Sequence, residues 1–311
     1  MPTKAEPNFL LGGTSAGGTS FLSAILLQHP KIYLPKNMRP EPHFFFKSWE
    51  FDKGYDHYLD SWFGDVPDDA IAVGERSSSY LYGGENVAEL ITRYLPDIKM
   101  IFVLRDPIDR AWANYRYTVL QGLEELTFEE ALKHESERVS SASGIWSEIQ
   151  PHDYTGRGYY GRQLQGFTKY MNLSNMFITC SEDLRKKTDS TLGSLSDFMG
   201  LDEPFSNIQR PVDYTSVSVV DPKIQKQARE HLSVKFDMVV EAIRDNSDPY
   251  RFTDSDQDEL WVSRLISNLE GEKKEIPEGA LSVLEGRFDE DLELLEEFVE
   301  FDVNGWTSNG K

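Results

Sequence analysis

Apolar residues in this chain form short continuous runs, and each run is followed by a segment in which apolar residues recur with helical spacing. Short runs bounded by turn residues or charges are typical of buried strands, and the spacing that follows is typical of amphipathic helices. Three such pairs are predicted: strand 8–13 with helix 19–28, strand 71–76 with helix 87–95, and strand 99–104 with helix 108–120. Successive strand-to-helix pairs indicate a parallel sheet, whose functional groups gather at the carboxyl ends of the strands.

Glycine, serine and threonine residues connect the first predicted strand to the first predicted helix, in the order Gly12-Gly-Thr-Ser-Ala-Gly-Gly-Thr-Ser20. Glycines let backbone N–H groups turn toward an anion, and the helix that follows directs its positive end to the same point. The spacing partly matches a nucleotide-binding P-loop, but Thr19 occupies the position of the lysine that ordinary ATP chemistry requires. We therefore expect a P-loop-like three-layer α/β fold with a central parallel sheet flanked by helices. A tight corner without a ligand is the alternative for the loop. The candidate binding residues are Gly13, Thr14, Ser15, Ala16, Gly17, Gly18, Thr19 and Ser20.

The rest of the chain continues the pattern less regularly. The elements predicted there are helix 156–170, strand 176–180, and helices 190–199, 223–245 and 285–301. We expect a single domain over residues 1–311, with a helical insertion at about 235–284, where the pattern is weakest.

The formal net charge of −21 narrows the range of partners. It disfavours nucleic acid and anionic membranes, because long-range electrostatics repels polyanions. The single cysteine, Cys180, excludes an intramolecular disulfide and suits a reducing compartment. The first residues lack the basic and apolar regions of a signal peptide, and no apolar run has membrane-spanning length. We expect a cytoplasmic protein without membrane insertion. The sequence indicates no oligomeric state, and no metal site is predicted because no His, Cys and Asp cluster has ligand spacing.

Charged and aromatic motifs accompany the predicted strand ends. They are Glu41-Pro-His-Phe-Phe45, Gly74-Glu-Arg-Ser-Ser-Ser-Tyr80, Leu104-Arg-Asp-Pro-Ile-Asp-Arg-Ala-Trp112 and Gly158-Tyr-Tyr160. With the glycine-rich loop, this ordered set resembles the PAPS-dependent sulfotransferases, in their bacterial and heparan-sulfate N-sulfotransferase-like branch. The resemblance covers about residues 8–205 and, more weakly, the terminal helix ending in Trp306. It implies PAPS as the sulfuryl donor and PAP as the product.

The resemblance also implies a donor site. Residues 13–20 would cradle the 5′-phosphosulfate, and Tyr160 would approach the adenine or the 3′-phosphate. Arg105 would bind the 3′-phosphate, which a guanidinium can contact bidentately. Ala113 stands where relatives carry a serine that helps to bind this phosphate. The alternative for the arginine is an ion pair with a neighbouring carboxylate, from Asp106, Asp109 or Glu75.

Three residues are candidates for the catalytic chemistry. Glu41 matches the catalytic glutamate of the branch, and we expect the flanking aromatic residues to raise its pKa. His43 is the rival base, since other members use a histidine from the equivalent segment; packing is its alternative role. Arg76 would stabilise charge on the transferring sulfuryl group, unless it forms a salt bridge with Glu75 or Glu41.

The sequence departs from the family pattern at the loop, where relatives usually carry a lysine or arginine and this chain has Ala16. One interpretation is replacement of the charge from a neighbouring segment; the candidates are Lys36, Arg39, Lys47 and Arg76. The alternatives are a PAP-binding pseudoenzyme and an ATP-dependent phosphotransferase. We favour an active sulfotransferase acting on a hydroxyl or amine, because Glu41, Arg76 and Arg105 occur together. The acidic composition favours a small-molecule, lipid-like, neutral glycan or carrier-bound acceptor over a highly sulfated polysaccharide.

Overall fold

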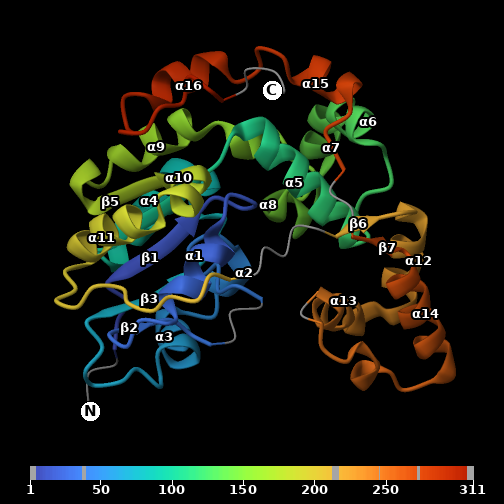
Figure 1. Ribbon diagram of the computed structural model, residues 1–311, viewed down its shortest axis with the longest axis horizontal. Helices are drawn as coiled ribbons and strands as arrows, with labels where there is room; N and C mark the ends of the chain where they lie inside the picture. The colour runs from blue at the N-terminus through green and yellow to red at the C-terminus, as the bar shows by residue number, and fades with distance from the viewer. Residues whose placement is uncertain (1–4, 37–39, 212–216, 245, 272–273, 307–311) are drawn as a thin grey trace. The chain divides into compact units, whose positions relative to one another are not determined.

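The computed structural model describes residues 5–36, 40–211, 217–244, 246–271 and 274–306 (Figure 1). The chain divides into two compact units, each formed by separate segments. Unit 1 comprises Met1–Arg110, Gly156–Pro211 and Gly286–Lys311, and unit 2 comprises Ala111–Thr155 and Val212–Glu285.

Unit 1 contains a five-stranded parallel sheet in the order β2-β3-β1-β4-β5. Its strands are β1 (Phe9–Gly13), β2 (Ile32–Tyr33), β3 (Ala72–Arg76), β4 (Lys99–Leu104) and β5 (Met176–Cys180). Leu11 of β1 pairs with Arg76 on one side and with Ile101 on the other, so the carboxyl ends of the three strands lie next to one another. The predicted parallel sheet, with the glycine-rich loop after its central strand, is confirmed.

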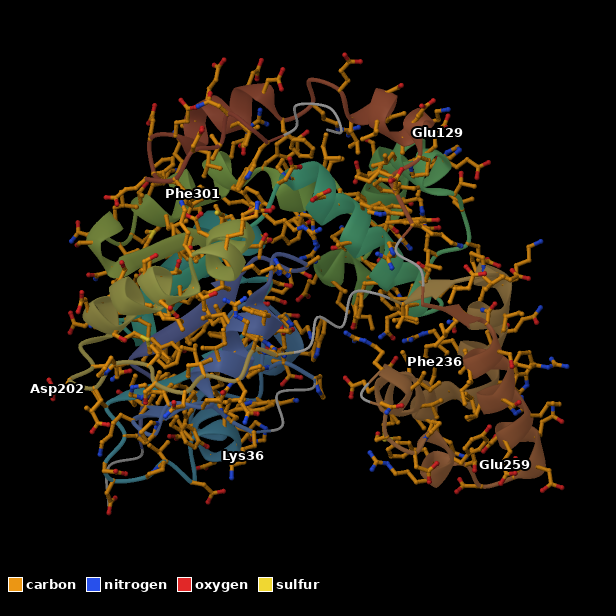
Figure 2. All side chains as sticks on the ribbon, in the orientation of Figure 1. Lys36, Glu129, Asp202, Phe236, Glu259 and Phe301 are labelled. Atoms are coloured by element: carbon orange, nitrogen blue, oxygen red, sulfur yellow. The ribbon has the colours of Figure 1, made fainter. Side chains whose placement is uncertain are left out.

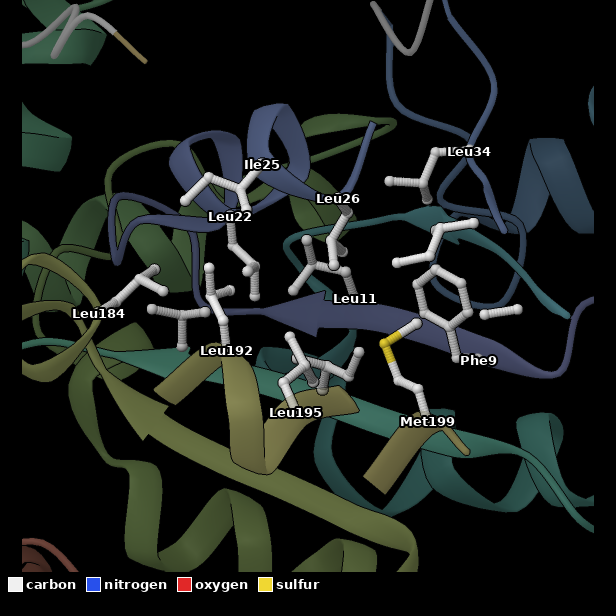
Figure 3. Close-up of a cluster of buried hydrophobic side chains, with 14 residues drawn as sticks. Phe9, Leu11, Leu22, Ile25, Leu26, Leu34, Leu184, Leu192, Leu195 and Met199 are labelled. Carbon is white, nitrogen blue, oxygen red and sulfur yellow. The ribbon is translucent and has the colours of Figure 1, made fainter. Parts of the chain in front are cut away.

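Helices cover both faces of this sheet. The helices of unit 1 are α1 (Thr19–Leu26), α2 (Ser48–Phe51), α3 (Tyr55–Trp62), α4 (Tyr80–Tyr94), the start of α5 (Pro107–Leu120), α9 (Tyr160–Thr168), α10 (Ser181–Lys186), α11 (Thr188–Met199) and α16 (Asp289–Leu295). Successive strand residues face opposite sides. Phe9 and Leu11 pack with α1 and α11 in the cluster of Figure 3. Phe102 faces the other way and contacts Phe167 of α9, with ring centroids 5.2 Å apart. The result is the expected three-layer arrangement.

Unit 2 is mainly helical. Its elements are the remainder of α5, α6 (Phe128–Lys133), α7 (Glu135–Ser141), α8 (Trp146–Ile149), β6 (Ser218–Val219), α12 (Pro222–Leu232), α13 (Phe236–Arg244), α14 (Asp256–Ser267), β7 (Leu269–Glu270) and α15 (Glu278–Leu284). Strands β6 and β7 pair antiparallel. Phe236, labelled in Figure 2, is fully buried in a cluster that also contains Leu232 and Val262.

Four helices differ by several residues from their predicted bounds. The helix predicted at 87–95 begins at Tyr80, and Gly84 interrupts its helical backbone with a φ of 53°. The single helix expected at 223–245 is two helices, α12 and α13, because Ser233 between them adopts a φ of 50°. The helix expected at 285–301 is confined to α16, and the one expected at 156–170 begins only at Tyr160. In the described part of the chain no helix combines the length and the apolarity needed to cross a bilayer.

Candidate active site

The glycine-rich loop joins the end of β1 to α1 and is fastened to β4. The Thr14 amide donates a hydrogen bond to the Val103 carbonyl at 2.9 Å, and the Gly17 amide donates to the Thr14 carbonyl at 2.9 Å. A Cβ on Gly17 would lie 2.5 Å from the Val103 oxygen, so only glycine fits there. Gly18 precedes α1 with a φ of 118°, a conformation that favours glycine. The loop thus has the close-packed backbone path that an anion-binding turn before a helix needs.

The remaining side chains of the loop are small: Ala16 lies within it, and Thr19 and Ser20 lie at the start of α1. Ala16 adopts a left-handed φ of 64°. Thr19 is buried and Ser20 is exposed at the first turn of α1. No charged side chain occurs between residues 12 and 20, so the positive potential of this segment comes from its backbone amides and from the N-terminal end of α1.

A buried guanidinium lies against this uncharged loop. Arg110, in the first turns of α5, is 0% exposed, and its Nη1 donates to the Ser15 carbonyl at 3.3 Å. Asp106 fixes the start of the same helix, because its Oδ1 accepts hydrogen bonds from the amides of Ile108 (2.8 Å) and Asp109 (3.2 Å). Burying a guanidinium is costly unless anionic or polar groups face it. The sequence motif contained this arginine, but nothing in its spacing indicated contact with the loop.

Glu41 is the most densely bonded carboxylate of the site. Its Oε1 lies 2.9 Å from Arg76 Nε, and its Oε2 lies 3.1 Å from His43 Nε2. The amide and the hydroxyl of Ser78 both donate to Oε2 at 2.8 Å. Burial alone would raise the pKa of Glu41, but the bond from His43, the Arg76 charge and the Ser78 amide together lower it. The expected rise in this pKa is therefore wrong: the nearby cation and donors outweigh the aromatic surroundings.

His43 is held in one orientation beside this carboxylate. Its backbone amide donates to Ser77 Oγ at 2.7 Å, and its φ is 48°. Burial lowers its pKa, although the Glu41 carboxylate opposes that shift. The Nδ1 atom is buried and has no hydrogen-bond partner within the described residues. A neutral ring that donates its Nε2–H to Glu41 fits these observations.

Glu75 lies beneath Ser77 and was considered from the sequence only as an ion-pair partner. It is 0% exposed and accepts hydrogen bonds from Tyr80 (2.7 Å), Ser77 (2.8 Å) and Tyr58 (3.3 Å). Burial raises its pKa to about 7, against the opposing effect of these donors. Its carboxyl thus anchors the hydroxyl that positions the backbone of His43.

Arg105 follows the end of β4 and forms a long ion pair. Its Nη2 lies 3.5 Å from Asp109 Oδ2, and the Asp109 side chain is 49% exposed, so this pair is weak. The Arg105 carbonyl accepts a hydrogen bond from the hydroxyl of the buried Tyr160 at 2.9 Å. Ala113 is half-buried in the part of α5 that belongs to unit 2, and its methyl group offers no hydrogen bond.

Two cations act on the Glu41–His43 pair besides Arg76. Lys47 and Arg157 both contribute to lowering the pKa of His43. Arg157 is buried, with its guanidinium 4.1 Å from the Tyr82 ring centroid and Nη1 3.3 Å from Ser79 Oγ. The sequence analysis did not single out Arg157; its place between two glycines before the Tyr159-Tyr160 pair was the available signal.

Of the other suggested replacement cations, Lys36 is exposed (Figure 2), and Arg39 lies outside the described residues.

Comparison with known proteins identifies the family. The model of the sulfotransferase domain matches residues 6–227, and the chain belongs to this family. The resemblance stated from the motifs is confirmed.

Relatives and a solved structure agree with this assignment. The chain is 29% identical over 202 residues to human heparan sulfate glucosamine 3-O-sulfotransferase 3B1, covering 64% of this chain and 47% of that protein. It is 28% identical over 216 residues to human bifunctional heparan sulfate N-deacetylase/N-sulfotransferase 2, covering 67% of this chain and 23% of that protein. The chain thus spans less than half the length of these relatives. A crystal structure of a sulfotransferase from Alicyclobacillus acidocaldarius superposes with a TM-score of 0.57 at 25% identity, covering 80% of this chain and 99% of that one.

Proposed function

We propose that this protein transfers the sulfuryl group of PAPS to a hydroxyl or amine and releases PAP. The observation that carries the proposal is the juxtaposition at two neighbouring strand ends. The anion-binding loop follows β1, and the Glu41–Arg76 pair, with 2.9 Å between Oε1 and Nε, lies at the end of β3. A donor cradle next to a carboxylate and a cation is what in-line transfer from a phosphosulfate requires.

The donor binds along the ends of β1 and β4. Residues 13–20 and the N-terminus of α1 hold the 5′-phosphosulfate, and Arg110 supplies the positive charge that the loop side chains lack. Arg105 exchanges its weak pair with Asp109 for the 3′-phosphate, because a phosphate offers bidentate, charge-assisted bonds. Tyr160 keeps the backbone of Arg105 in place for this contact.

Glu41 is the general base in this mechanism. The acceptor oxygen or nitrogen forms its bond to sulfur while the bond between sulfur and the bridging oxygen breaks, and PAP leaves with that electron pair. Glu41 takes the acceptor proton. The pairing with Arg76 lowers the basicity of Glu41 before the donor binds. When the anionic sulfuryl group draws Arg76 toward itself, the carboxylate loses part of this stabilisation and its pKa rises.

His43 serves as a hydrogen-bond donor to Glu41 in this scheme. Its Nδ1 is enclosed, so an acceptor reaches the 16%-exposed Glu41 side chain more readily than the ring. A catalytic role for His43 as the base itself is the alternative, and replacement of each residue separates the two.

The relatives named for heparan sulfate support a glycan hydroxyl or amine as the acceptor. The net charge of −21 favours a glycan with few anionic groups, or a small-molecule, lipid-like or carrier-bound acceptor.

Thermal unfolding with PAP, PAPS and ATP tests the donor. A ligand at 100 times its Kd stabilises the folded state by about 2.7 kcal/mol. We expect a clear shift with PAP and none with Mg²⁺-ATP; a shift with ATP alone would contradict the proposal and favour a phosphotransferase. Transfer of radiolabelled sulfate from PAPS to a panel of neutral glycans then tests turnover. Binding of PAP without transfer to any acceptor class would favour the pseudoenzyme.

A further inference from the structure

We propose that the C-terminal residues 286–306 position the donor site: Asp291 fixes the start of α9, and Tyr160, the first residue of α9, fixes the backbone of Arg105. The inference rests on the proposed function, because PAP binding is its readout. It assigns a role to a segment that lies beyond residues 6–227, the part of the chain that the family model matches.

Asp291 bonds directly to the first turn of α9. Its Oδ2 accepts a hydrogen bond from the Gly161 amide at 2.9 Å, and its Oδ1 accepts one from the Arg162 amide at 3.0 Å. The residue is 2% exposed. A carboxylate at a helix N-terminus is stabilised by the helix dipole and by charge-assisted bonds. Removing it leaves two buried amides without a partner, which is costly.

The C-terminal segment packs closely against the start of α9. A Cβ on Gly161 would lie 2.5 Å from the Asp291 carbonyl oxygen, and one on Gly158 would lie 2.9 Å from the Phe288 ring. Phe288 also contacts Tyr159, with ring centroids 5.3 Å apart. Figure 1 shows α16 beside α9. The two glycines therefore allow the C-terminal segment to lie directly against the start of α9.

Tyr160 connects the start of α9 to the backbone of Arg105 in the proposed donor site. Its ring is fully buried, with Trp306 of the same C-terminal segment at a centroid distance of 6.3 Å. Its hydroxyl donates to the Arg105 carbonyl at 2.9 Å. A shift at the start of α9 therefore moves or breaks the bond that holds Arg105.

Isothermal titration with PAP tests the proposal on Asp291→Asn, Tyr160→Phe, the double variant and the control Glu293→Gln. The control removes a carboxylate from an exposed position of the same helix. We expect the Kd for PAP to rise about tenfold in each single variant, the loss of roughly one charge-assisted or buried hydrogen bond. The control should stay within twofold. The double variant should bind within twofold of the weaker single one, because both changes break the same connection.

Two further readouts separate positioning from a general loss of structure. Amide hydrogen exchange should accelerate at Gly161 and Arg162 in Asp291→Asn, and the KM for PAPS should rise with kcat within twofold. Unchanged PAP affinity in both single variants, or a double variant about a hundredfold weaker, would overturn the positioning role alone. Failure of the unaltered protein to bind PAP would overturn the proposed function as well.

Discussion

The carboxyl ends of β1 and β3 are neighbours in one sheet, yet they present different chemical groups: backbone amides at β1 and charged side chains at β3. The end of β1 presents backbone amides, small residues and no charged side chain between residues 12 and 20. The end of β3 presents an ion pair, with Arg76 Nε 2.9 Å from Glu41 Oε1, and a buried carboxyl, Glu75.

Under the proposed function, this difference separates donor binding at the β1 end from proton transfer at the β3 end. A binding site made of backbone amides depends on the path of the chain, so it tolerates changes of side chain but not the replacement of its glycines. A site made of charged side chains depends on the positions of individual atoms and on the pKa values of those side chains. Four substitutions test this division.

Glu41→Gln should have the largest effect, because it removes the proposed base while keeping the shape of the side chain. We expect kcat to fall about a thousandfold, within the range typical of general-base catalysis. The Kd for PAP should stay within twofold, because the proposed donor cradle lies at the ends of β1 and β4. Transfer of labelled sulfate and titration with PAP measure the two quantities.

The matched control for this change is Glu50→Gln, which removes a carboxylate paired with Lys53 at 2.8 Å in the neighbouring helix. It should leave kcat within twofold. Full activity in Glu41→Gln, with loss in His43→Gln, would transfer the role of base to the histidine.

Glu75→Gln should change how stability depends on pH. Burial raises the folded-state pKa of Glu75 to about 7. Between its ordinary range and pH 7 the unfolded chain loses this proton while the folded chain keeps it. The free energy of unfolding of the natural protein should therefore fall with rising pH, by on the order of 3 kcal/mol from this group.

The amide side chain introduced by Glu75→Gln does not titrate, so this part of the slope should be missing from urea unfolding curves recorded from about pH 5 to 8. The exposed Glu296→Gln serves as control and should keep the slope of the natural protein. Parallel curves for the natural protein and Glu75→Gln would contradict the raised pKa of the buried carboxyl at the β3 end.

Gly17→Ala should weaken PAP binding about tenfold or more. The added Cβ would lie 2.5 Å from both Thr14 Cγ2 and the Val103 oxygen. Overpacking of this kind costs about 1–3 kcal/mol and displaces the loop. Gly193→Ala, where a Cβ meets no described atom within 4 Å, should bind PAP normally and be slightly more stable as a better helix former. Equal PAP affinity in both variants would refute the backbone dependence of the loop.

Ala16→Lys should have the smallest effect, less than about threefold on the Kd for PAP at moderate salt. Arg110 already supplies a charge at the loop through its contact with Ser15. Titration at low and high salt measures the gain. A large increase in affinity or turnover would instead mean that the loop had lost a charge that nothing replaced, in line with a degenerate enzyme.

The sequence predicted the sheet because short, mainly apolar runs, each followed by a helical pattern, are typical of the buried strands of a parallel sheet. The sequence also predicts Glu41 and Arg76 as candidate catalytic residues, with an ion pair between them as an alternative role for Arg76. The sequence does not reveal the places of Arg157 and Asp291, because these depend on contacts with residues far along the chain. The lowered pKa of Glu41 is equally hidden: its aromatic neighbours are adjacent in sequence, whereas Arg76 and the Ser78 donors approach only in the folded protein.

The docking of α16 on α9 also sets an order of events during synthesis. Unit 1 takes its last segment from residues 286–311, so the ribosome must first make the whole of residues 212–285. At about 5–20 residues per second this takes several seconds, during which the start of α9 lacks its Asp291 carboxylate and its Phe288 cover. Unit 1 therefore completes its packing only after the residues of unit 2 have been synthesised, although its sheet is encoded far upstream.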